Sequence, residues 1–223
     1  MAVQIAMMEE EFLIQPRSFV IGQLTQPLEI QPTGATGIFS VRFYPDGFLP
    51  FSDFPIDAMK NTAISIEEIF GEAGVHLEEN ILSAPDTESR IRIMEKFLLD
   101  QLSLPQNVDR VIQATVETIL TANGQLTIEG LTQSTSISQR QLERKFAKAI
   151  GLSPKRLTDI VRLQAALKKL LNQDFTSLTS LAYEGEYYDQ AHFIKDFKKY
   201  TGHTPREVYG YKLKMSSLFY GEE

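Results

Sequence analysis

Arg140, Glu143, Arg144 and Lys148 follow the three- and four-residue spacing of a helix in this chain of 223 residues. Residues at this spacing share one face of a helix. Here that face is polar and basic, so it can enter the major groove of DNA, where an arginine can bond the O6 and N7 atoms of guanine. A solvated helix surface without a ligand would show the same pattern. The elements around these residues must decide between the two interpretations.

The charge of the chain supports the DNA interpretation only in its second half. The net charge is −7, which by itself argues against binding to an anionic partner. However, residues 1–105 carry sixteen acidic and six basic side chains, whereas residues 106–223 carry thirteen acidic and sixteen basic ones. The segment 138–174 alone holds nine lysines and arginines and three acidic residues. Such a segment could neutralise phosphates.

Other kinds of chemistry have less support in the sequence. The absence of cysteine excludes disulfides, thiolate metal sites and a cysteine nucleophile, and it fits a reducing cytoplasm. The histidines His76, His192 and His203 fall in no spacing typical of a catalytic triad or a metal site, and no glycine loop that could hold a phosphate is present. We therefore expect no enzyme activity, no metal and no cofactor. The apolar runs fall short of the ~20 residues of a membrane span, so we expect a soluble, cytoplasmic protein that does not bind membranes.

An internal repeat provides the elements that position the basic face. Four landmarks recur 51 residues later: Leu142, Phe146, Gly151 and Pro154 become Phe193, Phe197, Gly202 and Pro205. Upstream the offset falls to 50, so the second copy holds one extra residue near Tyr188 and Asp189. Each copy predicts a short helix, a turn and a second helix, with its apolar residues pointing inward at i and i+4.

Capping residues and periodicity predict where the helices begin and end. We expect a helix from Val108 to Asn123-Gly124, a short helix after Thr127, helices capped by Ser138 and Asp189, and a long connector that starts at Ser153-Pro154. The connector would hold the two recognition helices about one turn of DNA apart, ~34 Å.

The first hundred residues predict a smaller α+β module. The runs Phe19–Leu24 and Ile38–Tyr44 predict strands, and helical patterns follow at Ile64–Phe70, Val75–Leu82 and Thr87–Leu102. Two or three strands cannot close a barrel, so we interpret residues 1–104 as a partial sensor or dimerisation module. Residues 105–223 would form the DNA-binding domain, with helix-turn-helix units at about 126–151 and 178–202. The predicted fold class is therefore mainly α: a C-terminal all-α double helix-turn-helix domain with a long connecting helix, preceded by the α+β module.

Over about 100 residues the chain resembles the AraC-type (AraC/XylS) transcription regulators, whose DNA-binding domain joins two helix-turn-helix units through one helix. The likeness rests on three groups of residues: Ser138, Leu142, Arg144, Phe146, Gly151 and Pro154; Arg162, Leu163 and Ala166; and Leu181, Ala182, Asp189, Gln190, Phe193, Phe197, Gly202 and Pro205. The segment Val41–Gly47 is similar to a β-segment found in small sensor domains of this family.

The resemblance implies a sequence-specific transcription regulator with double-stranded DNA as its partner. It implies base reading by Arg140, Glu143, Arg144, Gln190, Ala191, His192 and Lys195, and phosphate contacts by Ser138, Lys148, Lys155, Lys199 and Arg206. The N-terminal module would add a response to an effector, for which an apolar small molecule is the plainest guess, or homodimerisation.

Two departures from the family concern the turns. The family usually has glycine where this chain has Ser136 and Glu186. If position 186 needs a positive φ, a glutamate there costs ~1 kcal/mol. We therefore expect the first unit to supply most of the sequence reading and the second to contribute placement. The alternative is a ligand-binding or adaptor protein whose helix-turn-helix pair no longer binds DNA, which the acidic N-terminal half and Glu186 favour.

Overall fold

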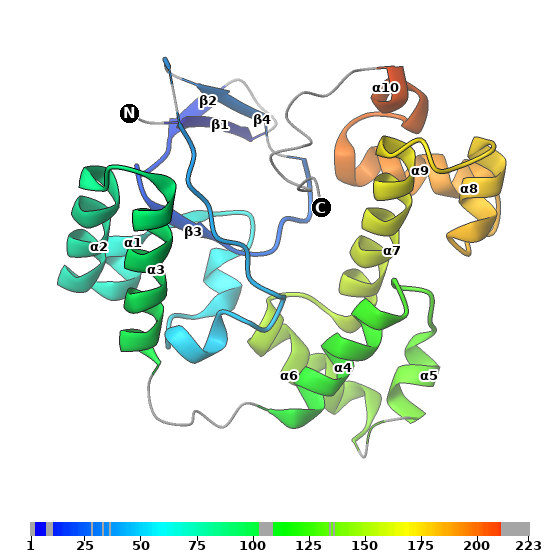
Figure 1. The fold of residues 1–223 in the computed structure, drawn as a ribbon. Helices are drawn as coiled ribbons and strands as arrows, with labels where there is room; N and C mark the ends of the chain where they lie inside the picture. Colours follow the sequence, from blue (N-terminus) through cyan, green and yellow to red (C-terminus); the bar gives the residue numbers. More distant parts are fainter. Residues whose placement is uncertain are drawn as a thin grey trace. The chain divides into compact units, whose positions relative to one another are not determined.

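The computed structural model describes residues 3–7, 11–27, 29–32, 34–35, 37–102, 109–133, 135 and 137–210 (Figure 1). The expected domain boundary at residues 104–107 and the turn residue Ser136 lie outside this part of the chain. The chain forms two compact units, one of residues 1–24, 28–116 and 140–152, the other of residues 25–27, 117–139 and 153–223. The boundary near residue 104 stays a prediction.

The first unit contains all the strands of the described residues. β1 (Val3–Met7) lies between β2 (Glu11–Ile14) and β4 (Glu29–Pro32) in an antiparallel sheet, and β3 (Phe19–Ile21) pairs antiparallel with β5 (Ala63–Ser65). The strand predicted at Phe19–Leu24 is confirmed over residues 19–21. The strand predicted at Ile38–Tyr44 is wrong, because those residues pair with no strand, and Ile38, Val41 and Tyr44 are exposed. A β-prone sequence forms a strand only where a partner strand and a buried face are available.

Three helices of the first unit lie side by side in Figure 1: α1 (Ile66–Phe70), α2 (Glu72–Ser83) and α3 (Thr87–Gln101). The side chain of Ser65 accepts a hydrogen bond from the backbone N–H of Glu68 at 3.0 Å. This cap begins α1 at Ile66, so Ile64, which was predicted to be helical, belongs to β5 instead. Two short 3₁₀ helices, η1 (Leu49–Phe51) and η2 (Ile56–Met59), precede them. Phenylalanine rings from residues 43, 48, 70 and 97 form a chain of edge-to-face contacts.

The helix α6 (Gln139–Ile150) groups with the first unit and has a fully buried apolar side. Leu142 and Phe146 are both 0 % exposed, as their spacing predicted, and Ile150 continues the row. Gly151, at φ 77°, follows the last helical residue. α4 (Arg110–Thr121), which precedes it in the chain, contributes the buried Ile112 and Val116 to this unit.

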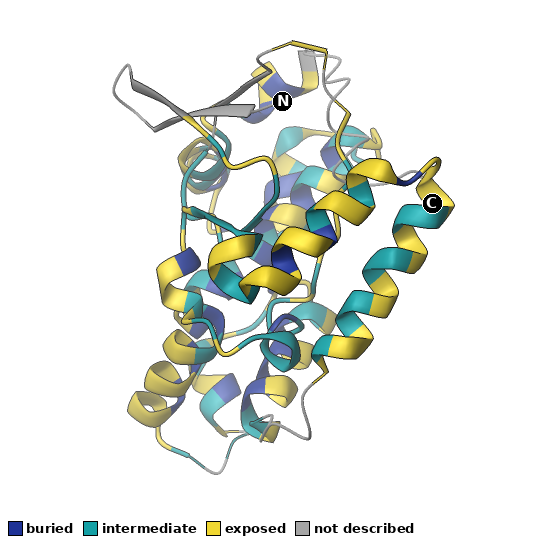
Figure 2. Cartoon of the chain, turned by 90° about the vertical axis from the view of Figure 1, so that its left-hand side faces the viewer, coloured by how far each residue is buried: buried dark blue, intermediate teal, exposed yellow. Residues whose placement is uncertain are grey.

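The second unit consists of helices. It holds α5 (Ile128–Gln133), the long connector α7 (Pro154–Leu171), α8 (Leu178–Glu184), α9 (Gln190–Thr201) and α10 (Pro205–Gly210). The predicted caps of α7 and α9 are present: Ser153 accepts from the Arg156 N–H at 3.2 Å, and Asp189 accepts from the His192 N–H at 2.7 Å. Figure 2 shows how buried and exposed residues alternate along the helices. The core of this unit joins α7, α8, α9 and α10 through Leu163, Ala166, Leu170, Leu181, Ala182, Tyr187, Phe193, Phe197 and Val208.

The internal repeat is present in the local structure. α6 and α9 each contain 12 residues, and both ends of α9 lie 51 positions after those of α6. α7 and α10 begin at the equivalent prolines, Pro154 and Pro205. Gly151 and Gly202 share a φ of 77°. The mainly α fold with two helix-turn-helix segments is therefore confirmed, and so is the smaller α+β part before them. Among the described residues, no helix is both long and apolar enough to cross a membrane.

The turn of the second repeat contains a strained residue. Glu186 has a φ of 54°, the left-handed region that non-glycine residues rarely adopt. Its side chain is exposed, while its backbone N–H donates to the Tyr183 carbonyl at 3.0 Å. The condition stated for position 186 is therefore met: the glutamate adopts a positive φ in this turn.

Replacing Glu186 with glycine should stabilise the protein by ~0.5–1 kcal/mol. The left-handed conformation costs a non-glycine residue ~1–2 kcal/mol, and the entropy that glycine loses on folding offsets ~0.5–1 kcal/mol of this gain. Urea unfolding followed by circular dichroism measures the change. Gly202→Ala is the matched control with the opposite sign, because residue 202 is also left-handed. An unchanged or lowered stability of Glu186→Gly would show that the turn is not strained.

Candidate nucleic-acid interface

A basic stripe lies along α6, on the side opposite its buried row. It consists of Arg140, Arg144 and Lys148, which are spaced four residues apart and are all exposed. Leu142 and Phe146 point the other way, into the core. No ion pair within the described part of the chain involves any of the three basic side chains of the stripe. Their charges are therefore available to an external anion. Glu143 is exposed at the edge of the stripe.

Much of the remaining basic charge in segment 138–174 is used inside the protein. Lys145 forms an ion pair with Asp109, Arg162 with Asp159 at 3.1 Å, and Lys169 with Glu184 at 2.6 Å. The hydrogen bond from Lys145 lowers the pKa of the Asp109 carboxyl, which keeps that partner ionised. The count of nine basic residues in the sequence therefore overstates the charge that DNA could meet.

Arg156 also has a role within the second unit. Its guanidinium donates to the Thr25 carbonyl at 2.8 Å and lies 5.1 Å from the centre of the Tyr200 ring. An arginine bonded to a carbonyl and placed over an aromatic face stabilises the fold. We therefore do not count it as part of the interface.

The first turn of α9 carries fewer basic residues on its exposed side than the first turns of α6 do. Of the residues expected to read bases, Ala191, His192 and Lys195 are exposed. His192 lies 3.4 Å from the Asp196 carboxylate, and its ring meets Tyr187 edge-on. The side-chain oxygen of Gln190 accepts a hydrogen bond from Thr179 of α8 at 2.9 Å. Two side chains at the beginning of α9, Gln190 and His192, therefore already have partners within the protein.

The residues expected to contact phosphate are all exposed, and they lie at helix starts or on exposed helix faces. Ser138 immediately precedes α6, and Lys155 lies in the first turn of α7. Arg206 lies in the first turn of α10, and Lys199, on the exposed side of α9, stands 5.0 Å from the centre of the Tyr200 ring. Their exposure is compatible with phosphate contacts, and their assigned roles stay predictions.

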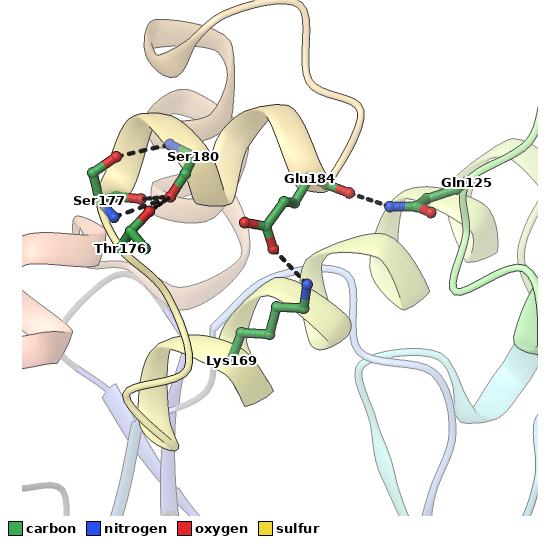
Figure 3. A network of polar contacts seen from close by, with 6 residues as sticks. All are labelled: Gln125, Lys169, Thr176, Ser177, Ser180 and Glu184. Carbon is green, nitrogen blue, oxygen red and sulfur yellow. Dashed lines mark hydrogen bonds and ion pairs between the residues drawn. The ribbon is translucent and has the colours of Figure 1, made fainter.

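A polar network fixes α8 to the connector (Figure 3). Glu184 is held twice: its carboxylate binds Lys169 of α7, and its backbone carbonyl accepts from the side chain of Gln125. At the other end of α8, Ser177 and Ser180 form a reciprocal capping box. An open pocket of about 430 Å³, whose lining includes Gln125, Lys169 and Glu184, lies beside this network. Because Thr179 of α8 holds Gln190, the network also positions the start of α9.

The turn after α4 packs closely against the connector α7 at Gly124. Gly124 has a φ of 70°, and a Cβ atom there would lie only 2.4 Å from the Thr158 carbonyl oxygen of α7. No side chain fits at that distance. The turn signal Asn123-Gly124, which the sequence offered only as a helix end, therefore also permits this packing.

The sequence pattern did not reveal the role of Tyr187, which anchors the second turn. The residue is 3 % exposed, and the Arg162 guanidinium lies 4.6 Å from its ring centre. Burial raises the pKa of its phenol to about 12, so it stays neutral at physiological pH. The only sequence signal was its alignment with the apolar Ile137 in the first repeat, which indicated a buried position but not the arginine above it.

Two comparisons with known families cover different parts of the chain. The model of the family described as "Helix-turn-helix domain" matches residues 131–209. The model of the family described as "Domain of unknown function (DUF6597)" matches residues 2–65. The first match includes both recognition helices, α6 and α9, and the connector between them.

Individual relatives are similar to the chain over limited lengths. An uncharacterized HTH-type transcriptional regulator of Haemophilus influenzae is 39% identical over 80 residues, which are 36% of this chain and 26% of that protein. The chain thus spans about a quarter of the length of this curated relative. A solved apo structure of a ToxT variant from Vibrio cholerae is 12% identical with a TM-score of 0.39, over 61% of this chain and 54% of that one. At that score the likeness does not establish a common fold.

The repeat, the helix pattern and the sequence matches agree on the C-terminal part. Its helices α6 and α9 have buried rows on one side and polar faces on the other, and the helix-turn-helix family model spans them both. Residues 131–209 therefore contain two helix-turn-helix segments and are similar to the family described as "Helix-turn-helix domain".

Proposed function

We propose that this protein regulates transcription by binding specific sites in double-stranded DNA through α6 and α9. The observation that carries the proposal is the basic stripe of Arg140, Arg144 and Lys148, which is exposed and has no acidic partner among the described residues. Arg140, Arg144 and Lys148 are spaced four residues apart, and like charges at this spacing on a helix repel. A phosphate backbone would offset that repulsion and release counterions.

The two recognition helices contribute differently in this proposal. On α6, Arg144 lies in the middle of the stripe, where a helix in the major groove comes close to base edges. On α9, the residues Gln190 and His192 already have partners inside the protein, so Lys195 and Lys199 supply charge for placement. Reading of the base sequence would therefore come mainly from α6, in the first helix-turn-helix.

Selection of bound sequences from a random duplex library tests the proposal directly. Binding at about 50 mM salt, weakening steeply as salt rises, is the expected result, and an enriched sequence would identify the site. If no duplex from the library or from fragmented genomic DNA binds, the proposal fails. The adaptor interpretation, in which the helix-turn-helix pair has lost DNA binding, would then be favoured.

Arg144→Ala should weaken binding to the selected site by ~1–3 kcal/mol and reduce discrimination at one base position. The matched control is Arg92→Ala, which removes the same charge from the exposed face of α3, outside the helix-turn-helix domain. Fluorescence anisotropy with selected and random duplexes measures both changes. Equal losses on the two duplexes would show that Arg144 contacts phosphate and not a base.

Lys148→Ala and Lys155→Ala should each weaken binding to all duplexes by a similar factor. Both side chains are exposed, and each phosphate contact that is lost lowers the slope of log K against log salt by ~1. A salt titration of each variant measures the slope. A variant whose slope equals that of the wild type would not have lost a phosphate contact.

The proposal includes control by the N-terminal part, through a small effector or through dimerisation. α3 supports dimerisation, because none of its residues is buried although it carries Ile91 and Leu99, which are 40% and 67% exposed. Large apolar side chains on one helix, left in water, are typical of association surfaces.

If α3 is the association surface, the Ile91→Lys/Leu99→Lys double variant should be monomeric where the wild type is dimeric. Lysine on both helices of a dimer places like charges against each other at the interface. Analytical ultracentrifugation at micromolar concentration measures the state. A monomeric wild type, or a dimer that survives the double substitution, would remove this part of the proposal.

A further inference from the structure

The second repeat contains one residue that the first lacks, and that residue is Tyr188. In the first repeat, Ile137 is followed directly by Ser138 and then by α6. In the second, the buried Tyr187 and the capping Asp189 are separated by Tyr188. Its side chain is 88 % exposed. The insertion therefore places a large aromatic side chain in solvent immediately before the recognition helix α9.

The backbone on both sides of Tyr188 is firmly held. On one side, the Tyr187 ring packs against Phe193 with a centroid distance of 5.1 Å, and its N–H donates to the Ala182 carbonyl at 3.0 Å. On the other side, the Asp189 carboxylate caps α9 through the His192 N–H. The position of the Tyr188 Cα is thus fixed, and only its side-chain torsions are free. Binding through this side chain would cost little conformational entropy.

The surroundings of Tyr188 favour a neutral hydrogen-bond donor over a positive charge as the contact group. The turn and cap already carry Glu184, Glu186 and Asp189, and Lys169 neutralises only the first of these. A lysine or arginine at this position would be attracted to the remaining carboxylates of the turn. A phenol carries no charge, so it can donate a hydrogen bond without requiring a counter-charge. Tyrosine hydroxyls are regular donors to phosphate oxygens in protein–DNA interfaces.

We propose that the Tyr188 hydroxyl donates a hydrogen bond to a DNA phosphate where α9 enters the major groove. This inference rests on the proposed function, since it assumes that α9 docks on DNA. It assigns to Tyr188 a part in positioning the second helix-turn-helix on DNA. This residue is not among those expected to read bases on α9. This contact also explains why a solvent-exposed aromatic side chain stands at this point of the turn.

The test compares Tyr188→Phe with the wild-type full chain on two duplexes, one selected from the random library and one random. Loss of a hydrogen bond to a charged oxygen should lower the affinity for both by about 10-fold. The slope of log K against log salt should stay unchanged, because a phenol releases no counterion. Tyr44→Phe is the matched control, because Tyr44 is 76% exposed and lies in the N-terminal part. The affinity of this variant for both duplexes should equal that of the wild type.

Each other outcome contradicts the inference in a recognisable way. A loss confined to the selected duplex would mean that Tyr188 contacts a base, and an unchanged affinity would mean that its hydroxyl makes no contact. Circular dichroism melting of Tyr188→Phe confirms that the variant is folded, as expected for the removal of an exposed hydroxyl. If the wild type binds neither duplex, the proposed function itself has failed, which is distinct from a wild type that binds and a variant that is unaffected.

Discussion

Burial of two apolar side chains one helical turn apart fixes the orientation of each recognition helix. In α6 these are Leu142 and Phe146, and in α9 they are Phe193 and Phe197; all four are 0 % exposed. Burying a side chain of this size contributes ~1.5–3 kcal/mol, so turning either helix about its axis would expose two such groups at once. The polar residues of each helix must then lie on the opposite side. The basic stripe on α6 is therefore a consequence of its core residues as much as of its charged ones.

The two repeats use the same core pattern but differ in how their outer surface is held. In the second repeat, the carboxylates of Asp189 and Asp196, the amide of Gln190 and the ring of His192 are all engaged within the domain. In the first, Arg140 and Arg144 have no such partners among the described residues. A side chain that is already bonded must give up its partner before it can bond a base. This internal cost is a physical reason for unequal roles of the two helices, independent of any difference in net charge.

The sequence predicted the C-terminal part well because its signals are local. Ser153, Pro154 and Asp189 act on the helix starts next to them, and each was found in the predicted role. The strands of the N-terminal part were predicted less well than its helices, because strands depend on distant partners. β3 pairs with β5, more than forty residues later, whereas Ile38–Tyr44 has a β-prone sequence and no partner. The sequence also could not predict three contacts of basic residues within the protein, because each acceptor is distant in the sequence. These contacts are Lys145 with Asp109, Arg156 with Thr25, and Lys169 with Glu184.

The negative net charge of the chain does not conflict with a basic interface, because electrostatic interactions in salt solution are short-ranged. At physiological ionic strength the screening length is ~8 Å, whereas nine residues of helix from Arg140 to Lys148 extend ~12 Å. A phosphate that contacts this stripe therefore responds mainly to the stripe itself, and exposed carboxylates more than a screening length away contribute little. Lower salt increases the screening length, so a phosphate at the stripe is repelled by carboxylates of the acidic half over a longer distance. It also strengthens each phosphate contact by favouring counterion release. The second effect grows with the number of contacts, so the steepness of the salt dependence reports how many charges of the stripe meet the DNA backbone.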